Sequence, residues 1–430
     1  MNSGSRLDPW IDQYAERAAS MTASEIRALF AVASRPEVVS LAGGMPFVSA
    51  LPLDELADTA ARMIRERGPV ALQYGSGQGD VDLREQICDV MALSGITAHP
   101  DDVVVTTGSQ MALDLVVRVF CDPGDVVLVE SPSYVGALGV FKAYECEVVH
   151  VAMDADGLHP TALADAIAAV QAQGKRIKLI YTIPSFHNPG GLTQPPQRRQ
   201  EILDVATRHG ILLLEDDPYS LLGFDGEVPR AIRADDDQGV VYLGSFSKTI
   251  AAGLRVGWAL APHGVREKLV LAAESAILCP SNFSQIMVSE YLATQPWQEQ
   301  VKVFRELYRE RGEALLSAMS HYLPPGTTWT VPAGGFYSWV TLPPGLDATA
   351  MLPRAVANLV AYVPGTGFYV DGQGRDSMRL SFCYPEPARI TEGVRRLGTV
   401  IDEELQLMAT FGAAAPQPRP GPNTPTPDLA

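Results

Sequence analysis

Short stretches in the middle of the chain carry side chains that can do chemistry. Lys248 ends the stretch Val-Tyr-Leu-Gly-Ser-Phe-Ser-Lys, and Arg255 follows in Gly-Leu-Arg-Val-Gly. Upstream, Asp216 begins Asp-Asp-Pro-Tyr, whose last residue is Tyr219, and Asn188 lies within Pro-Ser-Phe-His-Asn-Pro-Gly-Gly. The chain therefore places an amide, a carboxylate, a phenol, an amine and a guanidinium in that order along the sequence.

These groups are the ones that pyridoxal 5'-phosphate (PLP) needs from a protein. The amine of Lys248 can form a Schiff base and can then move a proton between Cα and C4'. The carboxylate of Asp216 can keep the pyridine nitrogen protonated, so that the ring accepts electrons. Asn188 and Tyr219 can reach the ring oxygen, and Arg255 suits the phosphate. A solvated lysine and a helix-capping aspartate are the ordinary alternatives, but the combination favours a PLP enzyme.

A second group of residues can hold the phosphate and the ring. The loop from Thr107 to Gln110 joins a strand to a helix, so the backbone of Gly108 and the hydroxyl of Ser109 can bind an anion there. Ser245 would complete this phosphate cup. Tyr134, in Ser-Pro-Ser-Tyr, is placed to stack on the pyridine face. The alternatives are an ordinary capping turn and a core tyrosine.

The sequence around these residues predicts strands that alternate with helices, and these elements must position the candidate side chains. The apolar strand-like runs are Val103–Thr106, Val126–Glu130, Cys146–Val151, Lys178–Tyr181, Ile211–Glu215, Val240–Gly244 and Gly257–Leu260. Helical patterns cover Gln110–Phe120, Pro160–Ala172 and Arg198–His209. This alternation predicts an α/β fold with a mainly parallel sheet that is covered on both faces. Ligand sites of such sheets lie at the carboxyl ends of the strands, where the candidate residues follow.

The pattern changes after about Ser281. Long helices are expected at Gln300–Leu323 and Met351–Ala361, with strands in Trp329–Leu342 and Met378–Phe382, which indicates a smaller α+β domain. We therefore predict an N-terminal arm and helix (1–45), a large PLP-binding domain (46–295), a small C-terminal domain (296–410) and a disordered Pro-rich tail (411–430).

The composition of the chain argues against several classes of binding partner. The chain has 430 residues, 47% of them hydrophobic, and a net charge of −17, which argues against nucleic acid or an anionic membrane surface. It lacks an apolar run of membrane-spanning length and a basic region followed by an apolar run, so we expect no membrane partner and a cytoplasmic location. The five cysteines form no C-x-x-C pair and the seven histidines are scattered, which predicts reduced thiols and no metal site.

In the order of its motifs, the chain resembles the fold type I PLP-dependent aminotransferases of the class I/II family over roughly residues 20–405. It is most similar to the branch of the 2-aminoadipate and kynurenine aminotransferases. The motifs behind this similarity are Ser-Leu-Ala-Gly-Gly-Met-Pro (Ser40 to Pro46), Leu-Gln-Tyr-Gly (Leu72 to Gly75), Thr-Thr-Gly-Ser-Gln and Pro-Ser-Phe-His-Asn-Pro. The resemblance implies a mostly parallel, seven-stranded sheet with a smaller domain, in a homodimer with shared active sites.

The same resemblance implies further site residues. Tyr74 matches a tyrosine that reaches the phosphate from the neighbouring subunit. Arg379, in Met-Arg-Leu-Ser-Phe, matches the arginine that clamps the substrate α-carboxylate, a bidentate role that suits guanidinium. Gly44 joins the substrate-binding residues, and Arg27 aligns with an arginine that reads a distal carboxylate. His187 stands where the branch often has Gln; it is either a contact to a polar substrate side chain or a plain loop histidine.

We thus expect a ping-pong aminotransferase (EC 2.6.1 class) that moves an α-amino group between an amino acid and a 2-oxo acid. The Ala/Arg/Pro-rich composition and the Pro-rich tail resemble transaminases of antibiotic biosynthesis. They favour an arylglycine such as (S)-3,5-dihydroxyphenylglycine or 4-hydroxyphenylglycine, paired with 2-oxoglutarate and glutamate. A 2-aminoadipate or general aromatic aminotransferase is the alternative. A PLP-binding regulator is another class, disfavoured because only about forty residues precede the motif at Ser40. Elimination or decarboxylation would use nearly the same site.

Overall fold

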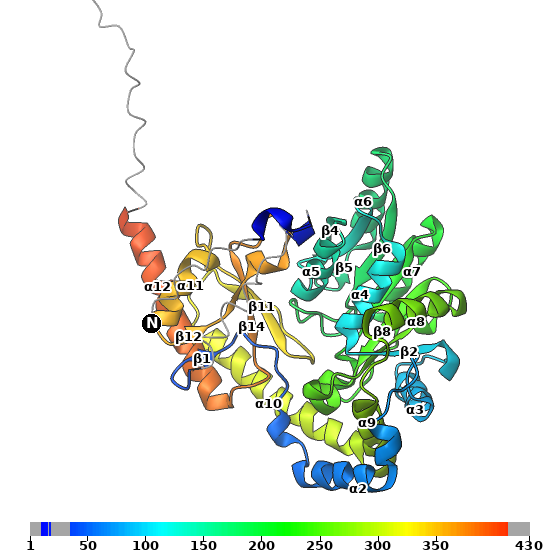
Figure 1. Ribbon diagram of the computed structural model, residues 1–430. Helices are drawn as coiled ribbons and strands as arrows, with labels where there is room; N and C mark the ends of the chain where they lie inside the picture. The colour runs from blue at the N-terminus through cyan, green and yellow to red at the C-terminus, as the bar shows by residue number, and fades with distance from the viewer. Residues whose placement is uncertain (1–9, 16, 19–34, 412–430) are drawn as a thin grey trace, which may run out of the picture.

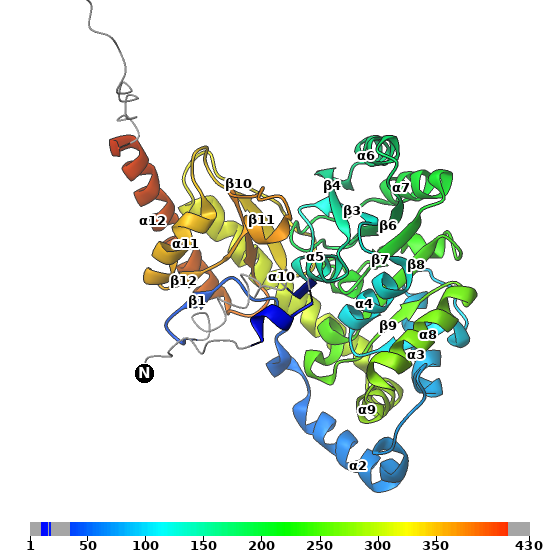
Figure 2. The same ribbon diagram turned by 45° about the horizontal axis from the view of Figure 1, so that its top comes forward.

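The computed structural model describes residues 10–15, 17–18 and 35–411. An eight-stranded sheet, a four-stranded sheet and a two-stranded sheet organise these residues. The elements from the C-terminal third lie beside the large sheet and its helices (Figures 1 and 2). Among the described residues, no helix is long and apolar enough to cross a membrane.

The large sheet has the strand order β2-β9-β8-β7-β6-β3-β4-β5. Only β9 and the short β5 run antiparallel to their neighbours. All seven predicted strands are present, and the mostly parallel sheet is confirmed. The eighth strand is a two-residue hairpin strand, too short to leave a pattern in the sequence. The bounds are β2 (Val103–Thr106), β3 (Val126–Ser131), β4 (Glu147–Asp154), β5 (Gly157–Leu158), β6 (Ile177–Thr182), β7 (Leu212–Asp216), β8 (Val240–Ser245) and β9 (Gly257–Leu260).

Helices cover both faces of this sheet, as the strand alternation predicts. Val127 and Val129 of β3 pack with α4 (Ser109–Phe120), α5 (Val135–Ala143) and α8 (His263–Ile277). The alternate residues Val126 and Leu128 pack with α6 (Pro160–Ala172) and α7 (Pro196–His209) on the other face. Because successive strand side chains point to opposite faces, each strand contributes to two separate cores. The predicted helices α4, α6 and α7 are confirmed.

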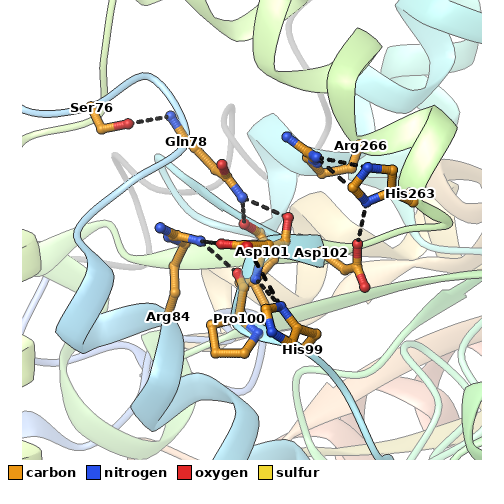
Figure 3. A network of polar contacts seen from close by, with 10 residues as sticks. Ser76, Gln78, Arg84, His99, Pro100, Asp101, Asp102, His263 and Arg266 are labelled. Carbon is orange, nitrogen blue, oxygen red and sulfur yellow. Dashed lines mark hydrogen bonds and ion pairs between the residues drawn. The ribbon is translucent and has the colours of Figure 1, made fainter.

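A polar network fixes the loop that follows α2 (Leu53–Ala71) against the start of β2. Nε2 of Gln78 donates to the carbonyls of Asp101 at 2.8 Å and Val103 at 3.0 Å. Nη1 of Arg84, on α3 (Val81–Ala92), lies 3.2 Å from a carboxylate oxygen of Asp101. His263 of α8 lies 3.0 Å from the carboxylate of Asp102 (Figure 3). The loop that carries Tyr74 is thereby held close to the edge of the large sheet.

The small domain contains the sheet β10-β11-β14-β13 and helices from the last part of the chain. A further pair of strands, β1 and β12, ties the segment before residue 41 to this domain. Helix α9 (Asn282–Thr294) packs on α2, and α10 packs on α12. The remaining bounds are β1 (Val39–Ser40), α10 (Trp297–Tyr322), β10 (Thr328–Trp329), β11 (Tyr337–Thr341), α11 (Ala348–Ala357), β12 (Val360–Ala361), β13 (Val363–Pro364), β14 (Ser377–Ser381) and α12 (Pro387–Phe411).

One prediction for this part of the chain was wrong in detail. The helix expected at Met351–Ala361 ends at Ala357, because Leu359 has φ +59° and the next residues pair with β1. The strands expected within Trp329–Leu342 are β10 and β11, which a loop separates. Helix α12 was not predicted. The domain boundaries stay predictions, and the N-terminal helix and Pro-rich tail fall largely on residues 1–9, 19–34 and 412–430, outside the described residues.

Candidate active site

The strands β2, β3, β6, β7 and β8 run in one direction, so the loops after them meet at one edge of the sheet. A cavity of about 470 Å³ lies at this edge, between the large sheet and the small domain. Most of the predicted site residues line it. They are Gly44, Ser109, Gln110, Tyr134, Asn188, Asp216, Tyr219, Ser245, Lys248, Arg255 and Arg379.

Lys248 lies on a one-turn π-helix, Ser247–Ala251, immediately after β8. Its Nζ donates a hydrogen bond of 2.9 Å to the carbonyl of Gly44. Burial lowers the pKa of Lys248 to about 8; the charges of Arg379 and Arg255 act in the same direction, whereas Cys383 opposes them. A lowered pKa leaves a larger share of the amine unprotonated near neutral pH, which suits a nucleophile.

Asp216 is the last residue of β7, and its side chain is almost fully buried. Oδ2 accepts a hydrogen bond of 2.8 Å from the phenol of Tyr181, but Oδ1 has no partner. Burial raises the pKa of Asp216 to about 7 against the opposing effect of Tyr181. An unsatisfied buried carboxylate oxygen is costly, and a protonated ring nitrogen is a donor that would satisfy it. The residue therefore fits the pyridine nitrogen of PLP.

The phosphate cup forms where α4 begins. Gly108 caps α4 at φ +79°, and a Cβ at this position would collide with the guanidinium of Arg255. Arg255 donates to the carbonyl of Thr107 and to the hydroxyl of Ser247, both at 3.3 Å. Ser245 accepts from the backbone N–H of Ser247 at 3.0 Å. A cation, hydroxyls and a helix N-terminus thus converge on one point, as a phosphate requires. Ser247 was not predicted.

Gln110 and Tyr134 support each other at the wall of the cavity. The phenol of Tyr134 donates to Oε1 of Gln110 at 3.2 Å, and Nε2 of Gln110 donates to the carbonyl of Gly136 at 2.9 Å. A Cβ on Gly136 would collide with the Tyr134 ring, so the ring lies close against this backbone. The carboxamide of Gln110 therefore fixes the orientation of a ring that is suited to stacking.

Arg379 comes from β14 and enters the cavity from the small domain. Its Nη1 donates to Oδ1 of Asn188 at 2.9 Å, and its guanidinium lies 4.2 Å from the ring centroid of Tyr337 and 5.1 Å from that of Phe368. Nε is buried without a partner. A planar guanidinium held between rings, with a free N–H, suits a carboxylate.

Sequence reasoning missed Tyr337, whose hydroxyl lies 3.4 Å from that of Tyr219. An aromatic residue in a strand is normally a core residue, so its type gave no signal. Tyr181 was missed for the same reason. Asn188 is nearly fully buried, and because its Oδ1 accepts from Arg379, its amide NH₂ is the end that can donate to a ring oxygen.

His187 does not line the cavity. It is 1% exposed, its Nδ1 accepts from the backbone of Gly190 at 3.0 Å, and its Nε2 lies 3.0 Å from Oε2 of Glu130. The carboxylate of Glu130 also accepts from Thr182 at 2.6 Å. His187 therefore supports the loop around Asn188 and is not a substrate contact, which agrees with the reading as a loop histidine.

Three predicted residues lie elsewhere. Gly108 adjoins the cavity through the cap of α4 and does not line it. Tyr74 is 76% exposed and does not line the cavity of its own chain, so its reach into a neighbouring subunit stays a prediction. Arg27 lies outside the described residues.

The fold and the cavity together define a PLP-dependent aminotransferase of fold type I, an enzyme of the transferase class. Residues 37–397 match the class I and II aminotransferases, and the chain belongs to that family.

Three similar proteins agree with this assignment. The aromatic-amino-acid aminotransferase 1 of Thermococcus litoralis is 39% identical over 91% of this chain and 95% of its own length. The 2-aminoadipate transaminase of Thermus thermophilus is 38% identical over 93% of this chain and 99% of its own length. The solved structure of the Pyrococcus horikoshii kynurenine aminotransferase, in complex with PMP, has a TM-score of 0.87 at 37% identity and covers 91% of this chain and 97% of that one.

Proposed function

We propose that this aminotransferase moves the α-amino group between an aromatic amino acid and the glutamate/2-oxoglutarate pair by a ping-pong reaction. One observation carries the proposal: a single cavity holds the amine of Lys248, the half-satisfied carboxylate of Asp216 and the guanidinium of Arg379. The first two serve PLP, and the third serves the carboxylate of an α-amino acid. An enzyme that handled amines without a carboxylate would have no use for the third group.

Each residue has a separate task in this proposal. Bound PLP supplies a ring that accepts the electron pair of the Cα–H bond. Nζ of Lys248 takes the proton from Cα of the substrate, and Arg379 holds the α-carboxylate so that this bond faces Lys248. Asp216 keeps the pyridine nitrogen protonated through Oδ1. The remaining residues hold the cofactor: Asn188 and Tyr219 at the ring oxygen, Tyr134 on the ring face, and Ser109, Ser245 and Arg255 at the phosphate.

The aromatic substrate class is supported by the names of the relatives and by the walls of the cavity. Aromatic-amino-acid and kynurenine aminotransferases are among the proteins that this chain resembles. Tyr337 lines the cavity from the small domain, where an aromatic side chain of the substrate can pack. Within this class we propose an arylglycine such as 4-hydroxyphenylglycine or (S)-3,5-dihydroxyphenylglycine, in antibiotic biosynthesis, on the composition of the chain. 2-Aminoadipate is the second candidate, supported by the 2-aminoadipate transaminase relative.

The assembly and the location are also proposals. We propose a homodimer in which Tyr74 reaches the phosphate of the neighbouring site. Val70, Leu72 and Tyr74 are exposed at and just after the end of α2, where Asn282 of α9 bonds the carbonyl of Val70, and exposed apolar groups at this place suit a subunit contact. A cytoplasmic location is consistent with the expected reduced thiols.

The test is a half-reaction panel. PLP-loaded enzyme is mixed with 4-hydroxyphenylglycine, tyrosine, kynurenine, 2-aminoadipate or glutamate, and pyridoxamine 5'-phosphate and the matching 2-oxo acid are quantified by chromatography. The proposal expects stoichiometric formation of both products with glutamate and with at least one aromatic amino acid. Release of ammonia or carbon dioxide without pyridoxamine 5'-phosphate would contradict it. A response to glutamate and 2-aminoadipate alone would favour the second candidate.

A further inference from the structure

The segment Leu41–Phe47 passes over the cavity between β1 and α2, and the small domain holds it by its backbone. The carbonyl of Leu41 accepts from the N–H of Ser381 at 2.7 Å, and that of Ala42 accepts from Nη2 of Arg379 at 2.6 Å. At the other end, the N–H of Phe47 donates to the phenol of Tyr308 at 3.0 Å. Both ends of the segment are therefore fixed to the same domain.

The middle of this segment is held by a thiol. Sγ of Cys383 lies 3.1 Å from the carbonyl of Met45 and 3.6 Å from that of Gly43, and it lies 3.3 Å from the hydroxyl of Ser381. Cys383 is fully buried. The single proton of the thiol faces the carbonyls on either side of Gly44, and the carbonyl of Met45 is the nearer acceptor.

The carbonyl of Gly44 points away from the thiol and toward the cavity. It accepts the 2.9 Å hydrogen bond from Nζ of Lys248. A Cβ on Gly44 would collide with the hydroxyl of Tyr337, so the backbone lies directly against that side chain. The peptide carbonyls of Gly43, Gly44 and Met45 therefore alternate between the thiol and the cavity, and only that of Gly44 meets the lysine.

We propose that Cys383 is a positioning residue for the reaction. By donating its proton to the carbonyl of Met45, with the carbonyl of Gly43 on the same side, the thiol keeps the carbonyl of Gly44 turned toward the cavity, where it accepts from the Lys248 amine whenever that amine is free. This inference rests on the proposed role of Lys248. It explains how a residue with no contact to the cavity controls the direction of an amine that must transfer a proton.

Without the thiol donor, the Gly43–Met45 backbone is free to turn, and the amine loses a fixed acceptor. A carbonyl acceptor favours the protonated amine, so its loss lowers the pKa of Lys248. The other titratable or charged groups that act on Lys248 are Arg379 and Arg255, which both stay in place. Burial raises the pKa of the Cys383 thiol, which favours its neutral form; the direct effect by which Cys383 raises the pKa of Lys248 is lost equally in Cys383→Ser and Cys383→Ala, so the difference between these two variants reports the donor.

The experiment compares Cys383→Ser, which keeps a donor, with Cys383→Ala, which removes it. Cys383→Val fills the volume without a donor and replaces the alanine variant if that variant does not fold. Cys88→Ala, on α3 and away from the cavity, is the matched control. In the cofactor-free protein, acetylation of Lys248 by acetic anhydride is followed against pH by mass spectrometry. We expect the midpoint to lie at lower pH in Cys383→Ala than in Cys383→Ser and to match the parent in Cys88→Ala.

In the PLP-loaded enzyme, Cys383→Ala should lower kcat by about two- to tenfold, the effect of one lost neutral hydrogen bond, with a smaller change in KM. Cys383→Ser should restore most of this loss. An alanine or valine variant that matches Cys88→Ala in both measurements would overturn the inference, as would a serine variant as impaired as alanine. Turnover by Lys248→Ala would instead refute the proposed function, so the two failures are distinguishable.

Discussion

Tyr181 donates its phenolic proton to Oδ2 of Asp216 over 2.8 Å, and this bond leaves Oδ1 of the same carboxylate as the one oxygen that faces a ligand. Both residues are buried, one in the middle of the large sheet and the other at the end of the neighbouring strand. The tyrosine fixes the rotation of the carboxylate. It also partly offsets the cost of burying a charge before the cofactor is bound.

The stability of the cofactor-free protein should therefore depend on pH through Asp216. Its pKa is about 7 in the folded protein, against an ordinary value of 3.8 for an aspartate, so the folded state binds more protons and stability falls as pH rises between these values. Asp216→Asn should remove this loss of stability, because an asparagine side chain does not ionise. At pH 8 the variant should be more stable than the parent by roughly 3–5 kcal/mol, and the difference should vanish toward pH 4.

Chemical denaturation across this pH range measures the difference, with the PLP-loaded parent as control. Loading should reduce the advantage of the variant, because the ring nitrogen then pairs with the parent carboxylate. The same substitution should lower the chemical rate far more than it weakens PLP binding. A pH-independent difference in stability would mean that Asp216 keeps its ordinary pKa.

Lys248→Ala should abolish turnover and leave the fold intact, since the side chain's hydrogen bond is to the carbonyl of Gly44 and no core packing depends on its amine. The phosphate cup does not include this lysine, so the variant should still bind PLP. Steady-state assays, circular dichroism and PLP fluorescence test the three parts of this prediction. Substantial transamination by the variant would assign the nucleophile to another residue.

The shared site predicts complementation between subunits. Tyr74→Ala should weaken PLP binding by about ten- to a hundredfold, the effect of losing one hydrogen bond to a charged group. Co-expression with Lys248→Ala should restore transamination at low PLP concentration in one site of each mixed dimer, because that site takes its lysine from one chain and its tyrosine from the other. Mixed dimers that stay as inactive as Tyr74→Ala would show that Tyr74 acts within its own chain or not at all.

Substitution of Arg27 should distinguish substrates with a distal carboxylate from arylglycines. If its guanidinium reads a distal carboxylate, Arg27→Ala should weaken glutamate and 2-aminoadipate by roughly 1.5–3 kcal/mol and an arylglycine much less. Values of kcat/KM for both kinds of substrate measure the effect, and Arg35→Ala, an exposed arginine, is the control. Equal losses for all substrates would show that Arg27 shapes the pocket generally.

The large sheet and the cofactor side of the cavity could be read from the sequence because their signals are local. Each strand is a short apolar run; Asp216 ends its strand, and Lys248 follows its strand within a few residues. Local spacing fixes where such residues emerge at the sheet edge, whatever the rest of the chain does.

The small domain was harder to predict because its features depend on distant pairings. The helical pattern after Met351 stops where β12 joins β1, more than 300 residues earlier in the chain. Tyr337 and Cys383 acquire their roles through Gly44, which lies far from both in sequence. No window of neighbouring residues contains these contacts, and the residue types alone indicate core packing.

The cavity has two walls of different origin, and this division makes the enzyme suitable for redesign. Lys248, Asp216 and the phosphate cup belong to the large sheet, whereas Arg379, Tyr337 and Gly44 come with the small domain and its attached segment. A mutant library confined to the second wall would vary the choice of amino acid and leave the lysine, the carboxylate and the phosphate cup unchanged. The cofactor's own absorbance would then count the correctly folded variants before any substrate was added.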